Sequence, residues 1–257
     1  MPEPADQPTP SLQPAESLQP VQSLQPRQTA PVQASSRLVL QPTIGPISLT
    51  QFYPFVLADP LTKRAELRAI KASHGVYTPA LDYWRLLRLQ IISHHRYTPG
   101  RGLDALDTAI ELAHASREAN YRLAVSNYRR FVGRRWVEWL GRPMRSLWEA
   151  GDLAVRVNPE LWISIDGEPF VVKLYLRSDP RWALDQRLAN PMVYLLQRFH
   201  DRLGRPLVFD VLRGRAFGLT RADVDYESLL QAQAAAFVSL WRSEHTPTPD
   251  EEAPLAA

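Results

Sequence analysis

A lysine stands in the middle of an apolar run, where residues 170–176 read Phe-Val-Val-Lys-Leu-Tyr-Leu. Placing an ammonium group among apolar side chains is costly unless a partner meets its charge. Lys173 is one of only three lysines in the chain, so two interpretations stay open. It is either an edge or snorkelling residue, or it belongs to a buried pair or a functional site. Tyr175 shares its face of a strand, because side chains repeat with period two.

Arginine and aromatic residues interleave over residues 121–136. Guanidinium groups make paired hydrogen bonds to phosphate, and aromatic rings stack on bases. The candidate nucleic-acid contacts are therefore Arg129, Arg130, Arg134 and Arg135. The alternative is an amphipathic helix whose aromatic residues face the core while its arginines reach water. The pI of about 9.3, at a net charge of only +3, fits either interpretation.

Composition excludes several classes of chemistry. The chain has no cysteine, which removes disulfides, thiolate metal sites and cysteine nucleophiles. It also lacks the glycine-rich nucleotide loops, the Gly-x-Ser-x-Gly elbow and the His-Glu-x-x-His motif. No apolar run approaches the roughly 18 residues of a membrane span, and the start lacks the features of a secretory signal. We expect a cytoplasmic protein without a membrane partner.

The two ends of the chain differ in composition from its middle. Ser-Leu-Gln-Pro recurs at residues 11–14, 17–20 and 23–26, and proline at this spacing disfavours both helix and sheet. We predict a disordered Pro/Gln-rich leader over 1–45 and a disordered tail over 244–257. The segment between them, 46–243, is predicted to be a single globular domain.

The predicted fold class is α+β. A helical part, residues 46–117, precedes a small mixed β-sheet flanked by helices, residues 118–243. Helices are expected to begin near Pro60 and at Thr78-Pro79, and a long helix or helix pair is expected from Leu103 to about Leu140. The later elements are expected in the order strands 153–157, 161–165 and 170–176, helix 182–203, strands 207–212 and 216–219, and helix 222–241. Asp166-Gly167 is a short hairpin signal between two of these strands.

The order of a helix, three antiparallel strands, a helix, a strand, a short strand and a helix over about residues 118–241 resembles the restriction-endonuclease-like core of the PD-(D/E)xK nuclease superfamily. In such sites two acids hold Mg²⁺ ions against a phosphodiester, and a lysine orients the attacking water or stabilises charge. The resemblance therefore implies Mg²⁺ as the cofactor of an active member and DNA or RNA as the partner.

Lys173 takes the lysine position of that family pattern. The resemblance implies Glu160 or Asp166 as the first acid, and thus Lys173, Glu160 and Asp166 as catalytic residues. The second acid stands two residues before the lysine in the family, and here that position is Val171. Its replacement would be Glu138, expected on the preceding helix, or Asp185 on the following one. The implied metal ligands are Glu160, Asp166 and Glu138.

Three functions compete on this basis. They are a metal-dependent nuclease, a catalytically inactive relative that binds nucleic acid or another protein, and a protein-interaction module that uses the leader as a spacer. The missing acid favours the second over the first. Clustering of the arginines, including Arg145, around the Lys173 face would favour the first two functions, whereas a diffuse spread would favour the third.

Overall fold

The computed structural model describes residues 42–75, 82–97, 103–221 and 223–244, which belong to one compact unit. Its fold class is α+β, as the sequence predicts. The tail from residue 245, the predicted cap at Thr78 and most of the predicted leader lie outside the described residues. The first strand, however, begins at Ile44, inside the range predicted for the leader.

Five of the described α-helices start after a residue whose side chain accepts a hydrogen bond from a free backbone N–H group. Ser48 forms a capping box with Gln51, and Asp59 precedes a helix that starts with Pro60. The α-helices of the described residues are α1 (Leu49–Leu57), α2 (Pro60–Ser73), α3 (Arg85–Tyr97), α4 (Asp107–Glu111), α5 (Ala115–Val132), α6 (Gln186–His200) and α7 (Tyr226–Ser243). Short 3-10 turns are η1 (Leu103–Leu106), η2 (Pro180–Trp182) and η3 (Asp201–Leu203).

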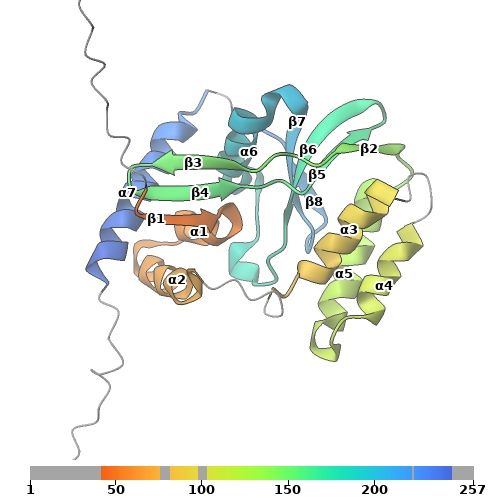
Figure 1. Cartoon of the computed structure of the whole chain (residues 1–257), viewed down its shortest axis with the longest axis horizontal. Helices are drawn as coiled ribbons and strands as arrows, with labels where there is room; N and C mark the ends of the chain where they lie inside the picture. Colours follow the sequence, from red (N-terminus) through yellow and green to blue (C-terminus); the bar gives the residue numbers. More distant parts are fainter. Residues whose placement is uncertain (1–41, 76–81, 98–102, 222, 245–257) are drawn as a thin grey trace, which may run out of the picture. The chain divides into compact units, whose positions relative to one another are not determined.

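The described strands form two sheets rather than the single predicted one (Figure 1). The smaller has the order β1-β4-β3, with β1 (Ile44–Ser48), β3 (Ser146–Ala150) and β4 (Leu153–Val157). The larger has the order β2-β5-β6-β7-β8, with β2 (Val137–Gly141), β5 (Leu161–Ile165), β6 (Glu168–Tyr175), β7 (Arg205–Asp210) and β8 (Arg215–Phe217). The larger sheet is mixed, because β6 and β7 are parallel and its other pairs are antiparallel.

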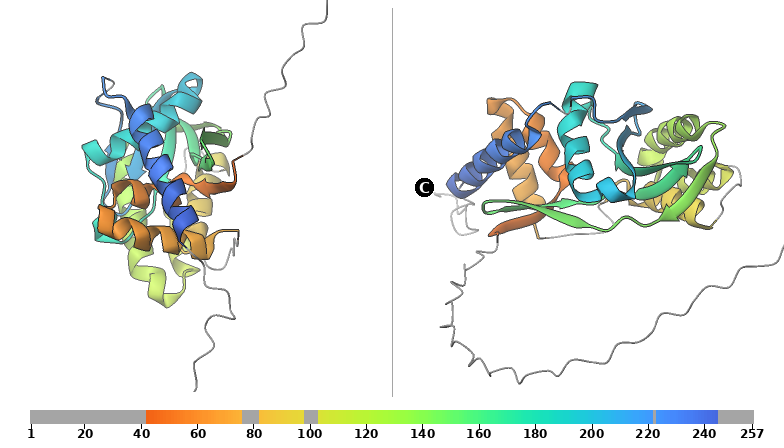
Figure 2. Two further views of the ribbon diagram at one scale, coloured as in Figure 1. Left: turned by 90° about the vertical axis from the view of Figure 1, so that its left-hand side faces the viewer. Right: turned by 90° about the horizontal axis from the view of Figure 1, so that it is seen from above.

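One long hairpin runs through both sheets, as the green ribbon in the right-hand view of Figure 2 shows. β3 pairs with β4 in the small sheet, and β2 pairs with β5 in the large one. Two prolines, Pro143 and Pro159, lie where the hairpin passes from one sheet to the other. Since proline cannot donate a ladder hydrogen bond, pairing is interrupted there and each half of the hairpin joins a different sheet.

Two hydrophobic cores result. The first lies under the small sheet among α1, α2, α6 and α7, and the second lies between the large sheet and α3–α5. Along β6, Val172 and Leu174 belong to the second core, whereas Tyr175 belongs to the first. Strand periodicity therefore places Lys173 on the face of the large sheet that α6 covers.

The structure corrects the prediction between residues 133 and 157. The helix expected to reach Leu140 ends at Val132, because Gly133 has a φ of 57° and its N–H caps the carbonyl of Arg129. The half-buried Val137 and Trp139 then alternate with exposed residues in β2, a pattern of period two that suits a strand. The predicted strand 153–157 exists as β4, but it lies in the other sheet.

The turn from α6 into β7 provides a test of this packing. Gly204 has a φ of 140°, and an added Cβ would lie 2.4 Å from the carbonyl oxygen of Pro169. Gly204→Ala should lower the free energy of unfolding by roughly 3 kcal/mol in urea denaturation, through backbone strain and overlap. Gly151→Ala is the matched control: its φ is 57° with nothing within 4 Å, and it should cost only about 1 kcal/mol. Equal losses would contradict the close approach.

Candidate functional site

Lys173 and Glu160 form a buried ion pair. The Lys173 ammonium lies 2.7 Å from Glu160 Oε1 and donates a second hydrogen bond, of 3.1 Å, to the carbonyl oxygen of Asn158. The other carboxylate oxygen, Oε2, accepts the backbone N–H of Leu174 at 2.8 Å. Lys173 is 2% exposed and Glu160 is 8% exposed, so each charge has the other as its main compensation. The interpretation of Lys173 as a member of a buried pair therefore agrees with this geometry.

The pair sits where the long hairpin changes sheet. Asn158 and Glu160 follow the end of β4 and lead into β5, while Lys173 lies near the end of β6. Glu160 also donates its backbone N–H to the carbonyl of Val172. Side-chain and main-chain bonds thus fix the segment 158–160 to β6, at the point where the regular ladder stops.

Asp166 and Glu138 lie at the opposite end of the β5–β6 hairpin. Asp166 is the turn residue, with a φ of 53°, and its Oδ1 accepts the backbone N–H of Trp136. Glu138 is exposed on β2, where it pairs in register with Ser164. From Glu168, beside the turn, to Lys173 the strand advances five residues, or roughly 16 Å. The structure therefore brings Lys173 and Glu160 together and leaves Asp166 and Glu138 apart from them.

The other acids near the predicted site have structural partners. Asp185 caps α6 by accepting the backbone N–H of Leu188. Val171 is fully buried in β6 and supplies no oxygen ligand. Within the part of the chain that the structure describes, no three His, Asp or Glu side chains gather closely enough to hold a metal ion.

Asp210 is a buried acid that sequence reasoning missed. It ends β7 opposite Tyr175 and is fully buried. Its carboxylate accepts backbone N–H groups of Leu184 and Arg213. Burial raises the pKa of the Asp210 carboxyl, and the nearby Arg213 guanidinium partly offsets this effect. The available signal was an acid inside the apolar run 207–212, since such a residue needs partners if it is buried.

The predicted arginines lie on the side of the large sheet opposite Lys173. The α5 residues Tyr128 and Phe131 contact Phe209, which faces the second core. Arg129 forms an ion pair with Asp107. Arg129, Arg130, Arg134 and Arg135 thus do not cluster around the Lys173 face, which was the arrangement expected of a nuclease or its inactive relative. Arg145, in contrast, precedes β3 at the junction between the two sheets.

The other arginines predicted to contact nucleic acid differ in whether they already bind a described residue. Arg135 donates to the carbonyl of Phe131 and lies over that ring. Arg130 and Arg134 are exposed, and neither forms an ion pair with another described residue. Trp136 follows them and is 63% exposed. These side chains are exposed to solvent near the start of β2 and do not lie around Lys173.

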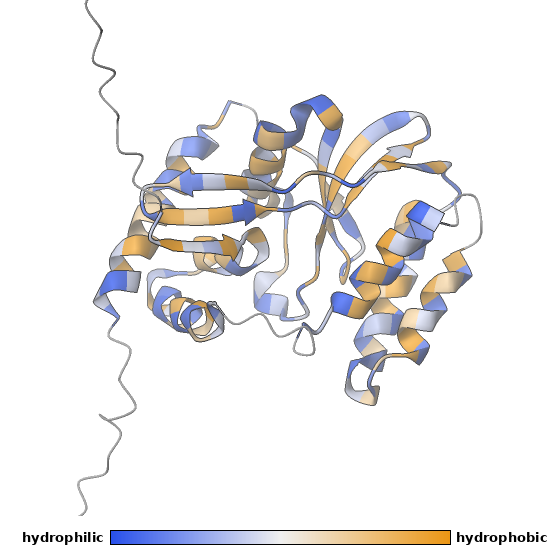
Figure 3. Cartoon of the chain, in the orientation of Figure 1, coloured by the Kyte–Doolittle hydropathy of each residue, from blue (hydrophilic) through white to orange (hydrophobic). Residues whose placement is uncertain are grey.

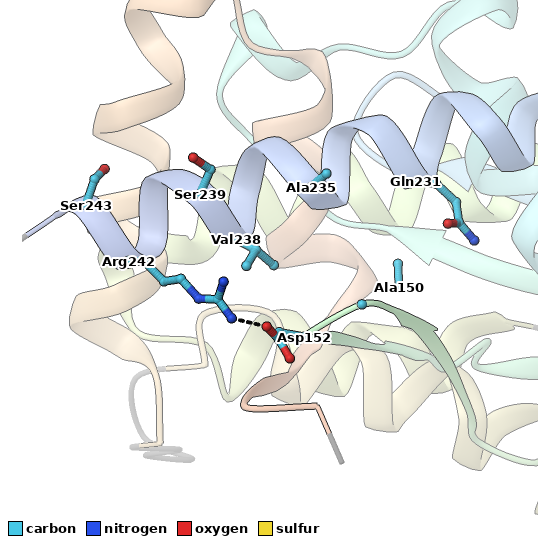
Figure 4. Close-up of a pocket in the computed structure, with 9 residues that line it drawn as sticks. Ala150, Asp152, Gln231, Ala235, Val238, Ser239, Arg242 and Ser243 are labelled. Atoms are coloured by element: carbon cyan, nitrogen blue, oxygen red, sulfur yellow. Dashed lines mark hydrogen bonds and ion pairs between the residues drawn. The ribbon is translucent and has the colours of Figure 1, made fainter. Parts of the chain in front are cut away.

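Lys173 lines neither of two hollows in the described part of the molecule. One, of about 730 Å³, lies between the β3–β4 turn and α7, where Arg242 forms an ion pair with Asp152 (Figure 4). Its other lining residues are small or neutral (Figure 4). The second, of about 420 Å³, lies at the β5–β6 turn with Phe131 and Phe170 in its wall and Arg135, Asp166 and Glu168 as its charged residues.

A stretch of exposed apolar residues along the β2–β3 arm of the hairpin was also missed. Trp136, Leu140, Met144 and Leu147 are all exposed large apolar residues within twelve positions. We call residues 136–149 the outer strand, because β2 and β3 are edge strands of their sheets. Arg134, Arg135, Arg142 and Arg145 are exposed within or beside it. The residues of β3, Ser-Leu-Trp-Glu-Ala, do not alternate between polar and apolar, so a pattern of period two did not mark this strand in the sequence.

The buried pair leads to a stability prediction. Lys173→Met removes the ammonium and leaves the Glu160 carboxylate buried, so the free energy of unfolding should fall by about 3–5 kcal/mol. Lys173→Met combined with Glu160→Gln removes both charges and keeps an oxygen for the Leu174 N–H, so most of this loss should be recovered. Denaturant unfolding of both variants measures the difference. A single variant as stable as the wild type would contradict the pairing.

Comparisons with known proteins add no family to this geometry. The chain matches no known family model. Neither a curated protein nor a solved structure matches it significantly. Among the described helices, none has the length and apolar character that crossing a membrane requires. The interpretation of function therefore depends on the described residues themselves.

Proposed function

We propose that the protein is a non-catalytic protein-interaction module in which Lys173 has a structural role. The observation that carries this proposal is the enclosure of Lys173, which is 2% exposed and bound to Glu160. The element order α5, β2, β5, β6, α6 and β7 is compatible with a degenerate nuclease-like architecture. The proposal does not depend on that resemblance.

Phosphodiester hydrolysis requires substrate to reach the groups that act on it. A lysine that stabilises phosphate must approach the phosphate oxygens, and metal-holding acids must keep oxygens available for the ion. Here both carboxylate oxygens of Glu160 are engaged, by Lys173 and by the Leu174 N–H. The position of the second family acid is the buried Val171. The geometry supports a closed structural junction better than an active centre.

The outer strand is the surface that best suits a partner. Met144 is 78% exposed and Leu147 is 47% exposed, and both lie on the same stretch as Trp136 and Leu140. Clustered exposed apolar side chains on a free sheet edge are typical of protein-binding sites. Aromatic residues, methionine and arginine are also the types enriched in interfaces.

A cleavage assay tests the proposal against the nuclease alternative. The full chain is incubated with plasmid, single-stranded DNA and RNA, with Mg²⁺ or Mn²⁺ and with chelator. We expect no metal-dependent cutting, because Lys173 is enclosed. The matched control is Lys173→Met with Glu160→Gln, which should behave as the wild type does. Metal-dependent cutting by the wild type that this folded variant loses would overturn the proposal.

One observation favours a second candidate function, the binding of single-stranded nucleic acid. Arg130 and Arg134 are exposed without an ion-pair partner in the described chain, and the exposed Trp136 follows them. Free guanidinium groups beside an exposed ring suit phosphate contact with base stacking. Under this function the site lies at the α5–β2 junction, not at Lys173.

Salt-dependent binding of a labelled single-stranded oligonucleotide tests this second function. Replacing both Arg130 and Arg134 by Glu should weaken binding about tenfold or more and flatten its salt dependence, because fewer phosphate counterions are released. Arg187→Glu is the matched control, since Arg187 is an exposed arginine on α6. Equal effects of the two changes would argue for non-specific charge attraction.

A further inference from the structure

The described sheets present four edge strands, and three of them carry features that discourage pairing with another chain. β1 contains Pro46 and an irregular register. β2 has a register irregularity between Trp139 and Gly141, and β8 spans only Arg215–Phe217. Proline, bulges and very short length are the usual protections of a sheet edge.

β3 carries none of these protections. Its sequence, Ser-Leu-Trp-Glu-Ala, has no proline, and its register with β4 is regular over all five residues. Along β3 the polar residues Ser146 and Glu149 are interspersed with Leu147, Trp148 and Ala150 (Figure 3). Trp148 and Ala150 are buried toward the first core, whereas Leu147 and Glu149 are exposed on the outer face. A regular, unprotected edge is able to accept a further strand.

Resting on the proposed interaction function, we infer that a second copy of this chain pairs with the edge of β3 in antiparallel orientation, centred on Leu147. Two-fold pairing about this residue places Arg145 opposite Glu149 of the second copy, and Glu149 opposite its Arg145. The two Leu147 side chains then meet at the centre. The pairing joins the two small sheets into one continuous sheet.

Charge complementarity identifies the occupant as a second copy. Leu147 and Glu149 lie two positions apart on β3 and so share its exposed face, and Arg145 is the exposed residue just before the strand. Directly opposite side chains in antiparallel strands approach to about 5 Å, and opposite charges there stabilise the pair. Both charged residues are exposed, and neither forms an ion pair with another described residue. A short edge buries less surface than a standard interface, so the dimer should be weak and depend on concentration.

The test is a charge swap on the full-length protein, followed by sedimentation over a range of concentrations. Arg145→Glu alone and Glu149→Arg alone each place like charges opposite each other, so either should weaken self-association about tenfold or more. The double variant Arg145→Glu with Glu149→Arg restores opposite charges and should dimerise as the wild type does. Circular dichroism confirms that each variant is folded.

Mixing the two single variants gives the sharpest outcome. In two-fold pairing, the glutamate introduced in one variant lies opposite the arginine introduced in the other. The mixture should therefore form heterodimers, although each variant alone associates only weakly with itself. A wild type that stays monomeric, or single variants that dimerise normally, would overturn the inference. A swap that fails to restore pairing would also overturn it, pointing to a different occupant of this edge.

These outcomes are separable from the proposed function. A monomeric protein that does not cut nucleic acid leaves the interaction function standing with another partner. Metal-dependent cutting contradicts that function whatever the oligomeric state.

Discussion

The ion pair between Lys173 and Glu160 closes the junction between the two sheets, so the two charges must be present or absent together. A buried ion pair gives little net stability compared with apolar side chains of the same size, but its partners cannot be removed singly without cost. Here the pair also binds the Asn158 carbonyl and the Leu174 N–H. It therefore gives hydrogen-bond partners to these two backbone groups, near the place where two prolines interrupt the ladder. In this way it fixes the position of the hairpin as it passes from one sheet to the other.

The long hairpin that runs through both sheets explains the rest of the architecture. A single hairpin contributes β3 and β4 to one sheet and β2 and β5 to the other, so each sheet needs its own helical cover. α6 connects β6 to its parallel neighbour β7 and packs with the first core. β2 and β3 are edge strands of their sheets, which is why the exposed Trp136, Met144 and Leu147 fall on one stretch of sequence.

Sequence reasoning predicted the elements whose pattern is local. α2, α6 and α7 and the strands β5, β6 and β7 agree with prediction apart from their ends, because proline, acidic caps and apolar runs mark them. It missed β2 and β3, since Arg and aromatic residues after Gly133 suit a helix as well as a strand. It also placed β4 in the wrong sheet, because sheet membership is set by long-range pairing that no local pattern encodes.

The partner of Lys173 was open to prediction from the sequence. The two-residue turn Asp166-Gly167 pairs Ile165 with Glu168, and such a turn fixes the register of its hairpin. Counting back along both strands places Glu160 opposite Lys173. The separation of Asp166 from the lysine follows from the same register, whereas that of Glu138 depends on the pairing of β2 with β5. Burial of the pair, in contrast, depends on α6 and the first core, which the strand pattern alone does not supply.

The central claim is that the Lys173–Glu160 junction is closed to solvent and forms part of the global fold. Hydrogen exchange at the Leu174 backbone N–H tests it most directly, because this group donates to Glu160 Oε2 beside the lysine. We predict that it exchanges only through global unfolding, with protection equal to that of the most stable core amides. Rapid exchange through local opening, as a site open to substrate would show, would contradict the account.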